Sequence, residues 1–239
     1  MTWSIVARDR PSGALGIAVT TKFFAVGALV PYLRTGVGAV ATQALVNPLY
    51  GTRGLALLEE GLPAAAVVRR LVEEDEGRGA RQVHLLDAVG RNAAHTGADC
   101  IPWAGHVLRD GFSVAGNMLV GPAVIADTAD TFETNRSLSF AERLITALDA
   151  GQAAGGDKRG RQSAALVIVS TEDYPDLSLR VDDHPEPLVE LRRLYEESRR
   201  VYEPYRRFMP TRERPSGVWD RAVINAAIAA AQAEPAKRR

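Results

Sequence analysis

Several segments of this chain are apolar on both faces of the strand that they predict. Leu15–Thr21, Gly36–Ala44 and Ala164–Val169 consist mostly of small or branched apolar residues, with few charges. A strand of this kind has to be covered on both faces, by helices or by a second sheet. The sequence therefore predicts a layered protein in which the strands are buried.

The order of the predicted elements narrows the fold class. The strand Thr2–Ala7 is joined to Leu15–Thr21 by a turn with Pro11 and Gly13, which predicts a hairpin. Further elements are predicted as two helices divided at Gly61-Leu62-Pro63, a hairpin of 82–87 and 92–96, a strand at 112–119, helices at about 122–134 and 139–153, and strands at 164–169 and 177–182. Runs of strands separated by pairs of helices favour an α+β fold, with two sheets and helices on both outer faces.

The chain after residue 184 has a different character. Leu188–Phe208 predicts a charged amphipathic helix, and an Ala-rich helix near Val218–Ala233 follows among three prolines. We predict two parts, a domain of residues 1–184 and a helical extension of residues 185–239. The extension is expected to pack on the body or on a partner subunit, which makes a homodimer plausible.

The composition limits the classes of partner. Lys and Arg number 29 and Asp and Glu number 29, so no global charge attracts nucleic acid or an anionic membrane. The single Cys100 forms no internal disulfide. A basic region followed by an apolar one is lacking at the N-terminus, and no apolar run approaches ~20 residues. We expect a cytoplasmic protein that acts on a small molecule and binds neither nucleic acid nor membrane.

Thr2 has a chemical potential that its neighbours lack. Its side chain is small enough for Met1 to be removed, and removal gives one residue both a hydroxyl and a free α-amine. The α-amine titrates near ~7.7–8.0 and accepts a proton at neutral pH. An N-terminal amine can activate a Thr hydroxyl without help from His or Asp. The alternative interpretation is that Thr2 only begins an edge strand.

Six blocks of sequence stand out, in this order: Thr2–Asp9, Val40–Ala44, His95-Thr96-Gly97, Cys100–His106, Gly116–Leu119, and Gly155-Gly156-Asp157 through Gln162-Ser163. Together they resemble the domain of unknown function 1028 family, which is grouped with the N-terminal nucleophile (Ntn) hydrolases. The resemblance runs from Thr2 to about Asp183 and continues more loosely into the next helix. The order of the blocks is specific for the family and says little about the substrate.

The resemblance implies a four-layer αββα sandwich in which the first residue of the first strand is the nucleophile. Ntn hydrolases cleave C–N bonds of the amide type. The N-terminal side chain attacks the carbonyl carbon, the α-amine transfers the proton, and hydrogen-bond donors hold the oxyanion. For this chain the implied nucleophile is Thr2, and Met1 is the only residue that has to be removed.

Within that scheme three further residues, Gln43, Asn117 and Lys22, are candidates for the catalytic machinery, and Thr42 is a candidate for substrate binding. The turn after Thr42 could present backbone N–H groups to an oxyanion, together with the side-chain amide of Gln43. Asn117 could add another donor, and the alternative is a buried amide bonded to backbone. Lys22 could lower the pKa of the amine through its positive charge, although most lysines are merely exposed.

Two loops carry candidate substrate-binding residues. The loop 155–163 could place its polar residues at the mouth of the site, with Arg159 or Arg161 holding a substrate carboxylate, and its candidates are Asp157, Arg159, Arg161 and Ser163. The loop 97–106 and the residues before it contribute His95, Cys100 and His106. The spacing of these three fits no standard zinc pattern, so we expect no metal and no cofactor. We expect the histidines to line the pocket or bond to backbone, and Cys100 to be a small buried apolar residue.

The sequence thus predicts an Ntn-type amidohydrolase of a small amide, peptide-like or ureido compound. Two alternatives stay open. One is a non-catalytic αββα protein that binds a small molecule or a partner. The other is a hydrolase that uses Cys100 as nucleophile, with His95 or His106 as base.

Overall fold

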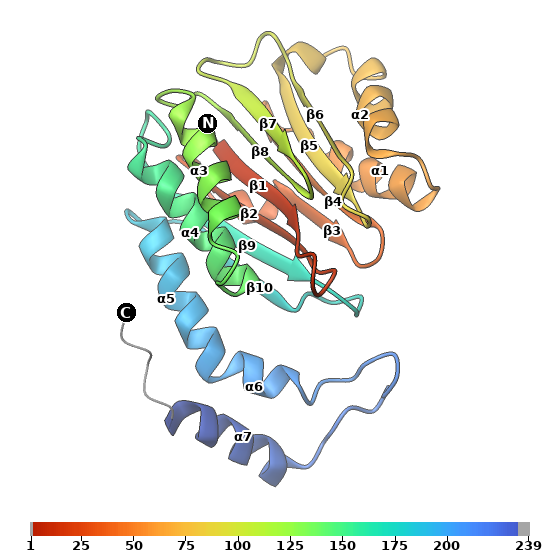
Figure 1. The fold of residues 1–239 in the computed structure, drawn as a ribbon, viewed down its shortest axis with the longest axis vertical. Coiled ribbons are helices and arrows are strands. Elements are labelled where there is room, and N and C mark those ends of the chain that lie inside the picture. Colours follow the sequence, from red (N-terminus) through yellow and green to blue (C-terminus); the bar gives the residue numbers. More distant parts are fainter. Residues whose placement is uncertain (1, 234–239) are drawn as a thin grey trace. The chain divides into compact units, whose positions relative to one another are not determined.

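The computed structural model describes residues 2–233 of the chain. The chain divides into two compact units, Met1–Leu191 and Arg192–Arg239, and the boundary falls inside a helix. The first unit contains two antiparallel sheets with helices packed on them, which confirms the α+β class (Figure 1). Within residues 2–233 no helix is both long and apolar enough to cross a membrane.

The larger sheet has six strands. Their spatial order is β10 (Leu177–Val181), β9 (Ser163–Val169), β2 (Leu15–Thr21), β1 (Thr2–Arg8), β8 (Phe112–Asn117) and β7 (Gly105–Arg109). Because β1 pairs with β2 on one side and β8 on the other, Thr2 begins an interior strand. The interpretation of Thr2 as the start of an edge strand is therefore wrong. The edge strands are β10 and β7, and β7 begins where the sequence predicts only a loop.

The smaller sheet has four strands. In spatial order they are β3 (Pro31–Arg34), β4 (Gly38–Ala44), β5 (Arg81–Asp87) and β6 (Asn92–Thr96). Short 3-10 helices precede β3 and β5, at Val26–Ala28 and Arg78–Ala80. The predicted hairpin of β5 and β6 is confirmed.

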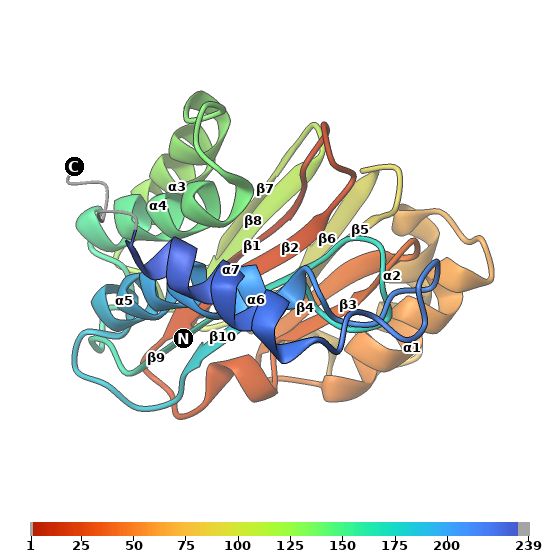
Figure 2. The same ribbon diagram turned by 90° about the horizontal axis from the view of Figure 1, so that it is seen from below.

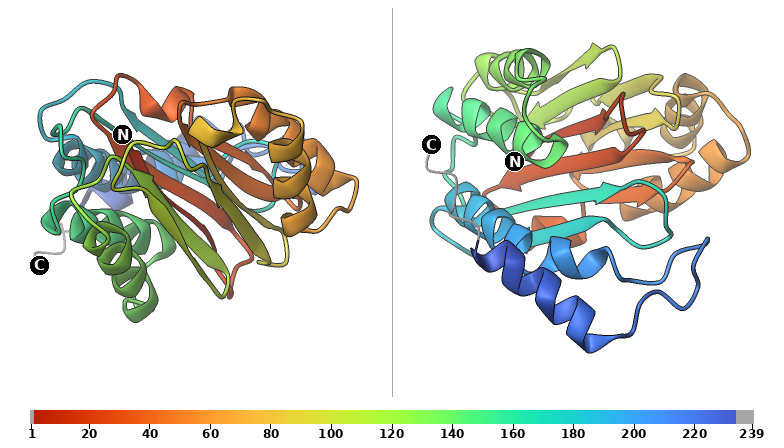
Figure 3. Two further views of the ribbon diagram at one scale, coloured as in Figure 1. Left: turned by 90° about the horizontal axis from the view of Figure 1, so that it is seen from above. Right: turned by 60° about the horizontal axis from the view of Figure 1, so that its bottom comes forward.

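Two pairs of helices cover the sheets. The smaller sheet carries α1 (Pro48–Glu59) and α2 (Ala64–Glu73), and the larger sheet carries α3 (Ala123–Thr134) and α4 (Phe140–Ala153), as the left view of Figure 3 shows. The predicted N-caps explain where α1 and α4 begin, because the side chain of Asn47 accepts from the Leu49 amide and that of Ser139 from the Glu142 amide.

Small residues allow the helices to approach the strands closely. A Cβ atom on Gly16 of β2 would lie 2.8 Å from side-chain atoms of both Phe140 and Leu144 on α4. On β5, Val83 and Leu85 pack towards α1 and α2, whereas Leu86 packs towards the other sheet. Both faces of β5 are thus buried.

The helix predicted over Leu188–Phe208 is in fact two helices, α5 (Pro187–Arg200) and α6 (Tyr202–Arg206) (Figure 2). Pro204 accounts for the break, because proline has no N–H for the carbonyl of Arg200 and its ring would clash with that carbonyl. The second unit also contains α7 (Arg221–Ala233), close to the predicted Ala-rich helix.

Candidate active site at the Thr2 end of the sheets

One end of the two sheets gathers the ends of strands that carry polar residues, and we call it the Thr2 end. Thr2 at the start of β1 lies opposite Asn117 at the end of β8. On its other side Thr2 lies beside Thr21, the last residue of β2, and Thr21 pairs in turn with Ser163. Because side chains alternate along a strand, Thr2 points to the same face as Ser4, which contacts the smaller sheet. These residues form a row that faces the space between the sheets.

A second polar row faces the first from the smaller sheet. Gln43 of β4 is paired with Gln82 of β5, and Gln82 is paired with Thr96 of β6. The two rows are joined by a hydrogen bond of 3.0 Å from Asn117 Nδ2 to Gln82 Oε1. The interior of the sandwich is therefore polar at the Thr2 end.

Thr2 is held in place by both of its neighbours. Its side chain is buried, and its hydroxyl donates a hydrogen bond of 3.1 Å to Thr21 Oγ1. Its carbonyl oxygen accepts from Asn117 Nδ2 at 3.4 Å. Met1, whose removal the proposed role of Thr2 requires, lies outside the described residues. The geometry brings Thr2 and Asn117 together, as the proposed roles require.

Buried hydrogen bonds continue from Thr2 along the inner faces of both sheets. Ser4 donates to Gln43 Oε1 at 2.6 Å, so the proton of the 2.8 Å contact between Ser4 Oγ and His84 Nε2 belongs to His84. His84 Nδ1 is then an acceptor, and Ser113 donates to it at 2.8 Å. Burial, with a smaller effect of the charge of His106, lowers the pKa of His84 to about 3. His84 is therefore a neutral structural imidazole at physiological pH.

Gln82 connects this network to the far side of the site. Its carbonyl oxygen accepts from both Gln43 and Asn117, at 2.8 and 3.0 Å. Its amide nitrogen donates to Thr96 Oγ1 at 2.9 Å, and Thr96 is 2.9 Å from His106 Nδ1. Both hydrogens of the Gln43 amide are donated inside the protein, to Gln82 Oε1 and to the carbonyl of Ala115. Gln43 thus holds the two sheets together.

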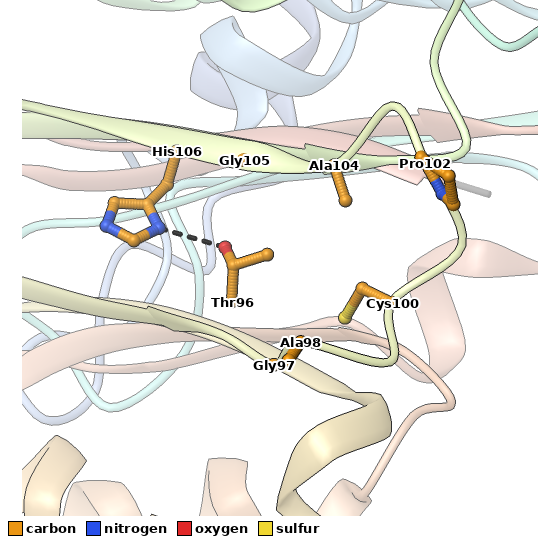
Figure 4. Close-up of a pocket in the computed structure, with 8 residues that line it drawn as sticks. All are labelled: Thr96, Gly97, Ala98, Cys100, Pro102, Ala104, Gly105 and His106. Atoms are coloured by element: carbon orange, nitrogen blue, oxygen red, sulfur yellow. Dashed lines mark hydrogen bonds between the residues drawn. The ribbon is translucent and has the colours of Figure 1, made fainter.

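A pocket of about 570 Å³ lies between the end of β6 and the start of β7, and we call it the β6–β7 pocket (Figure 4). Its lining consists mostly of small side chains, from Thr96, Gly97, Ala98, Cys100, Pro102, Ala104, Gly105 and His106. Burial, with the charge of His95, lowers the pKa of His106, and burial raises the pKa of the Cys100 thiol. Both groups are therefore uncharged at neutral pH, and so is the wall of the pocket.

The pocket residues do not form a nucleophile with a base. Cys100 Sγ donates to the carbonyl of Arg81 at 3.3 Å, and in residues 2–233 it makes no hydrogen bond to a histidine. His95 Nε2 is 2.9 Å from the carbonyl of Arg78, to which it donates, so His95 bonds to backbone. Within the described residues no group of three His, Cys, Asp or Glu side chains is arranged to hold a metal ion.

The loop 155–163 lies at the same end and is anchored by a buried carboxylate. Asp157 accepts from the backbone amides of Lys22 and Arg159, each at 2.8 Å, and pairs with the Arg159 guanidinium at 3.3 Å. Lys22 is exposed, and its ammonium donates to the carbonyl of Arg161. Arg161 pairs with Glu186. The loop is thus fixed beside the end of β2, next to Thr21.

Two other candidates have structural contacts. Ser163 donates to the carbonyl of Phe23 at 2.6 Å and accepts from the Val26 amide, which fixes the segment after β2. Thr42 donates to the carbonyl of Asn47 at 3.0 Å. Because Thr42 alternates with Gln43 along β4, its side chain lies on the helix-covered face, away from Thr2.

The backbone is strained at the Thr2 end. Ala25, Ala44 and Met118 have positive φ values of 52°, 68° and 54°. Ala25 and Met118 follow β2 and β8, and Ala44 is the last residue of β4. Such values are unfavourable for residues with a Cβ atom and tend to persist at functional sites. Among the described residues these are the non-glycine positions with positive φ, and all three lie at this end.

Sequence reasoning missed six residues of the network, namely Ser4, Thr21, Gln82, His84, Thr96 and Ser113. A signal was present in β5, where Gln82 and His84 alternate with Val83 and Leu85. Polar residues at every second position of a strand that is apolar on its other face indicate either solvent or a polar interior. The structure identifies the interior.

Comparisons with known proteins agree with this fold. The model of a family of unknown function, DUF1028, matches residues 2–191. A crystal structure of a DUF1028 protein from Silicibacter pomeroyi is 31% identical to this chain, with a TM-score of 0.86 over 92% of this chain and 96% of that chain. Anbu (ancestral beta-subunit) from Yersinia bercovieri is 13% identical, with a TM-score of 0.38 over 82% of this chain and 94% of that chain. No curated protein matches the chain.

Proposed function

This chain belongs to the DUF1028 family, whose function is unknown, and we propose from its site that it is an N-terminal nucleophile amidohydrolase that cleaves a C–N bond of a small molecule. The observation that carries the proposal is the position of Thr2. Its hydroxyl lies at the start of an interior strand, on the face between the sheets, at the end where polar side chains converge. A Thr whose only role was to begin a strand would not need polar side chains to converge around its hydroxyl.

The proposed reaction uses Thr2 as both nucleophile and base. After cleavage of the Met1–Thr2 bond, the free amine accepts the proton of the Thr2 hydroxyl as Oγ1 attacks the carbonyl carbon of the substrate amide. The amine then gives this proton to the leaving nitrogen, the C–N bond breaks, and the acyl group remains on Thr2 as an ester. Water, deprotonated by the same amine, attacks the ester and releases the acid.

Asn117 is the side-chain donor that we place nearest to the oxyanion. Its bond to the carbonyl of Thr2 is long, at 3.4 Å, so that hydrogen is the easiest to redirect towards a developing negative charge. Gln43 acts as a positioning residue, because both of its amide hydrogens hold other groups. In this proposal Lys22 contributes a positive charge that lowers the pKa of the Thr2 amine, and Thr21 orients the hydroxyl.

The wider proposal follows the same reasoning. The order of α3 and α4, the larger sheet, the smaller sheet, and α1 and α2 supports the four-layer αββα sandwich of Ntn hydrolases. The enzyme is proposed to be cytoplasmic, to need no cofactor, to act on a small-molecule substrate and to form a homodimer. The β6–β7 pocket, with His106 and Cys100 in its wall, takes part of the substrate.

The first experiment is the intact mass of the purified protein with a map of its N-terminal peptide. Loss of one Met supports the proposal, and a retained Met1 contradicts it, because the amine would then be an amide.

Hydrolysis of a panel of small amides and ureido compounds should disappear in Thr2→Ala and persist in Thr2→Ser. Circular dichroism should show that both variants are folded. Activity retained by Thr2→Ala would exclude Thr2 as the nucleophile.

A second candidate function is a small-molecule binding protein without catalysis, which the β6–β7 pocket favours. It predicts ligand binding that is unaffected by Thr2→Ala and by the state of Met1.

A hydrolase based on Cys100 predicts the reverse of the Thr2 pattern, with activity lost in Cys100→Ser. The raised pKa of that thiol and its bond to the Arg81 carbonyl count against this third candidate.

A further inference from the structure

Beyond the strand ends, three chain segments form a short ladder over the Thr2 end. Leu119 exchanges backbone hydrogen bonds with Trp103, at 2.9 and 3.3 Å, and forms a bridge with Asp157 on its other side. Asp157 in turn accepts from the amide of Lys22. The ladder therefore connects the β2 side of the site, where Thr2 lies, to the loop that forms the β6–β7 pocket.

Lys158 crosses this ladder. Its backbone follows Asp157 directly, and its ammonium donates a hydrogen bond of 2.8 Å to the carbonyl of Pro102. Pro102 lines the β6–β7 pocket. The side chain of Lys158 thus extends from the loop beside β2 to the rim of the pocket, above the end of β8.

The charge of Lys158 is not neutralised by the protein. Its arginine neighbours are compensated, because Arg159 pairs with Asp157 and Arg161 pairs with Glu186. In the part of the chain that the structure describes, Lys158 contacts no carboxylate, and its bond to Pro102 uses one of three N–H groups. Two N–H groups and a full positive charge therefore remain available at the rim.

The row of side chains gives the distance from the nucleophile. β1 and β8 pair Thr2 with Asn117, and β8 and β7 pair Gly116 with Gly105 of the pocket wall, so β8 lies between Thr2 and that wall. Two strand spacings thus separate Thr2 from the pocket wall, about 10 Å. A substrate whose amide carbonyl reaches Thr2 can place a group at that distance next to Lys158.

We propose that Lys158 is a specificity-determining residue that binds a carboxylate of the substrate, so that the substrate class is a small amide with a carboxylate about 10 Å from the scissile carbonyl. This inference rests on the proposed function. A single ammonium with two free N–H groups matches one carboxylate in charge and hydrogen bonding. The pocket wall carries no charge, so the segment that joins amide and carboxylate is uncharged.

The test measures binding, so that it does not depend on catalysis. Monoamides of dicarboxylic acids, from succinamate to suberamate, are titrated into the Thr2→Ala variant of the full chain by calorimetry, each beside its uncharged diamide. We expect suberamate to bind about tenfold more tightly than suberamide, and succinamate to show less preference because it is too short. Lys158→Met in the same background should remove the preference and Lys158→Arg should restore part of it.

The matched control is Arg69→Met, which removes one positive charge from the exposed side of α2. It should leave the preference unchanged. Equal binding of suberamate and suberamide, no binding of either, or a preference that survives Lys158→Met would each overturn the inference. The proposed function fails if Thr2→Ala still hydrolyses amides or if Met1 is retained. Neither result changes the binding preference that Lys158 is expected to cause, so the two failures can be told apart.

Discussion

The two ends of the sheets solve the same problem of chain reversal in different ways. At the end opposite to Thr2, the hairpin turns place Gly13, Gly36, Gly90 and Gly111 at positive φ, where glycine is tolerated without strain. At the Thr2 end, Ala25, Ala44 and Met118 adopt positive φ, beside the glycines of the 155–160 loop. One end is therefore built for easy closure, whereas the other accepts strain in segments that surround the candidate site.

Strand β5 shows the same contrast within seven residues. Its inner face runs from Gln82 and His84 near the Thr2 end to Leu86 near the other end. Leu86 belongs to an apolar core with Val6 and Ile17, whereas Gln82 and His84 are fully buried and hydrogen-bonded. The polar half has to satisfy every donor and acceptor, and the apolar half only has to fill space.

The largest effect on stability is expected from Gln82→Met. The change keeps the size of the side chain but removes the acceptor of Gln43 and Asn117 and the donor to Thr96. Each buried group left without a partner costs about 1–3 kcal/mol, so we expect a loss of about 3–5 kcal/mol in the free energy of unfolding, measured with urea. The matched control, Leu86→Met on the same face, should cost less than about 1.5 kcal/mol. Equal losses would show that the polar network adds nothing.

The polar half of β5 also marks where sequence reasoning stops. The strand itself, its hairpin and its burial follow from the period of the apolar residues. Val83 and Leu85 form the apolar face of β5, which the helices cover. The pattern of β5 does not indicate that the opposite face, with Gln82 and His84, is buried as well. Polar residues at alternate positions usually indicate a solvent face, and only the packing of the second sheet turns that face inward. For this reason Gln82 and His84 could not be assigned to the site.

The pH dependence of stability should follow His84. Burial lowers its pKa in the folded protein to about 3, whereas an unfolded His titrates near about 6.5. Between these values the unfolded state binds more protons, so the free energy of unfolding should fall by up to about 1.4 kcal/mol per pH unit as the pH decreases from 6.5. Urea titrations at pH 7.0 and 4.5 measure this, and His84→Gln should flatten the slope. An unchanged slope in His84→Gln would assign the effect to other groups.

A reciprocal pair of substitutions tests the contrast in backbone strain. A Cβ on Gly36 meets nothing within 4 Å, so Gly36→Ala should lose about 1–2 kcal/mol from its φ of 72° alone. Ala44→Gly relieves similar strain, but the greater freedom of the unfolded chain offsets about 0.4–1 kcal/mol of the gain. We expect a small stabilisation, measured by urea unfolding, and lower hydrolase activity if the strained turn shapes the site. If Ala44→Gly destabilises as much as Gly36→Ala, the Ala44 methyl is needed for packing.

The candidate site could be predicted in part for a physical reason. Thr2 and Asn117 lie at strand ends of one sheet, so a correct order of strands brings them together. The β6–β7 pocket required β7, whose residues Gly105–Arg109 follow a loop and are only half-buried or exposed, so their strand pattern is weak. The proposed role of Lys158 depends on a contact with the carbonyl of Pro102, which no residue pattern encodes.

The smallest effect is expected from an exposed ion pair at the end opposite to Thr2. The side chains of Arg10 and Asp110 form a pair that is 59% and 86% exposed, so water and salt screen their attraction. Arg10→Met should change the free energy of unfolding by less than about 0.5 kcal/mol, and Lys158→Met at the Thr2 end should do the same. Arg10→Met and Lys158→Met should then differ in one measurement, the preference for suberamate over suberamide, which only Lys158→Met should remove. A loss above about 1 kcal/mol in Arg10→Met would mean that the opposite end also depends on specific charge contacts, and that the contrast between the two ends lies in the backbone alone.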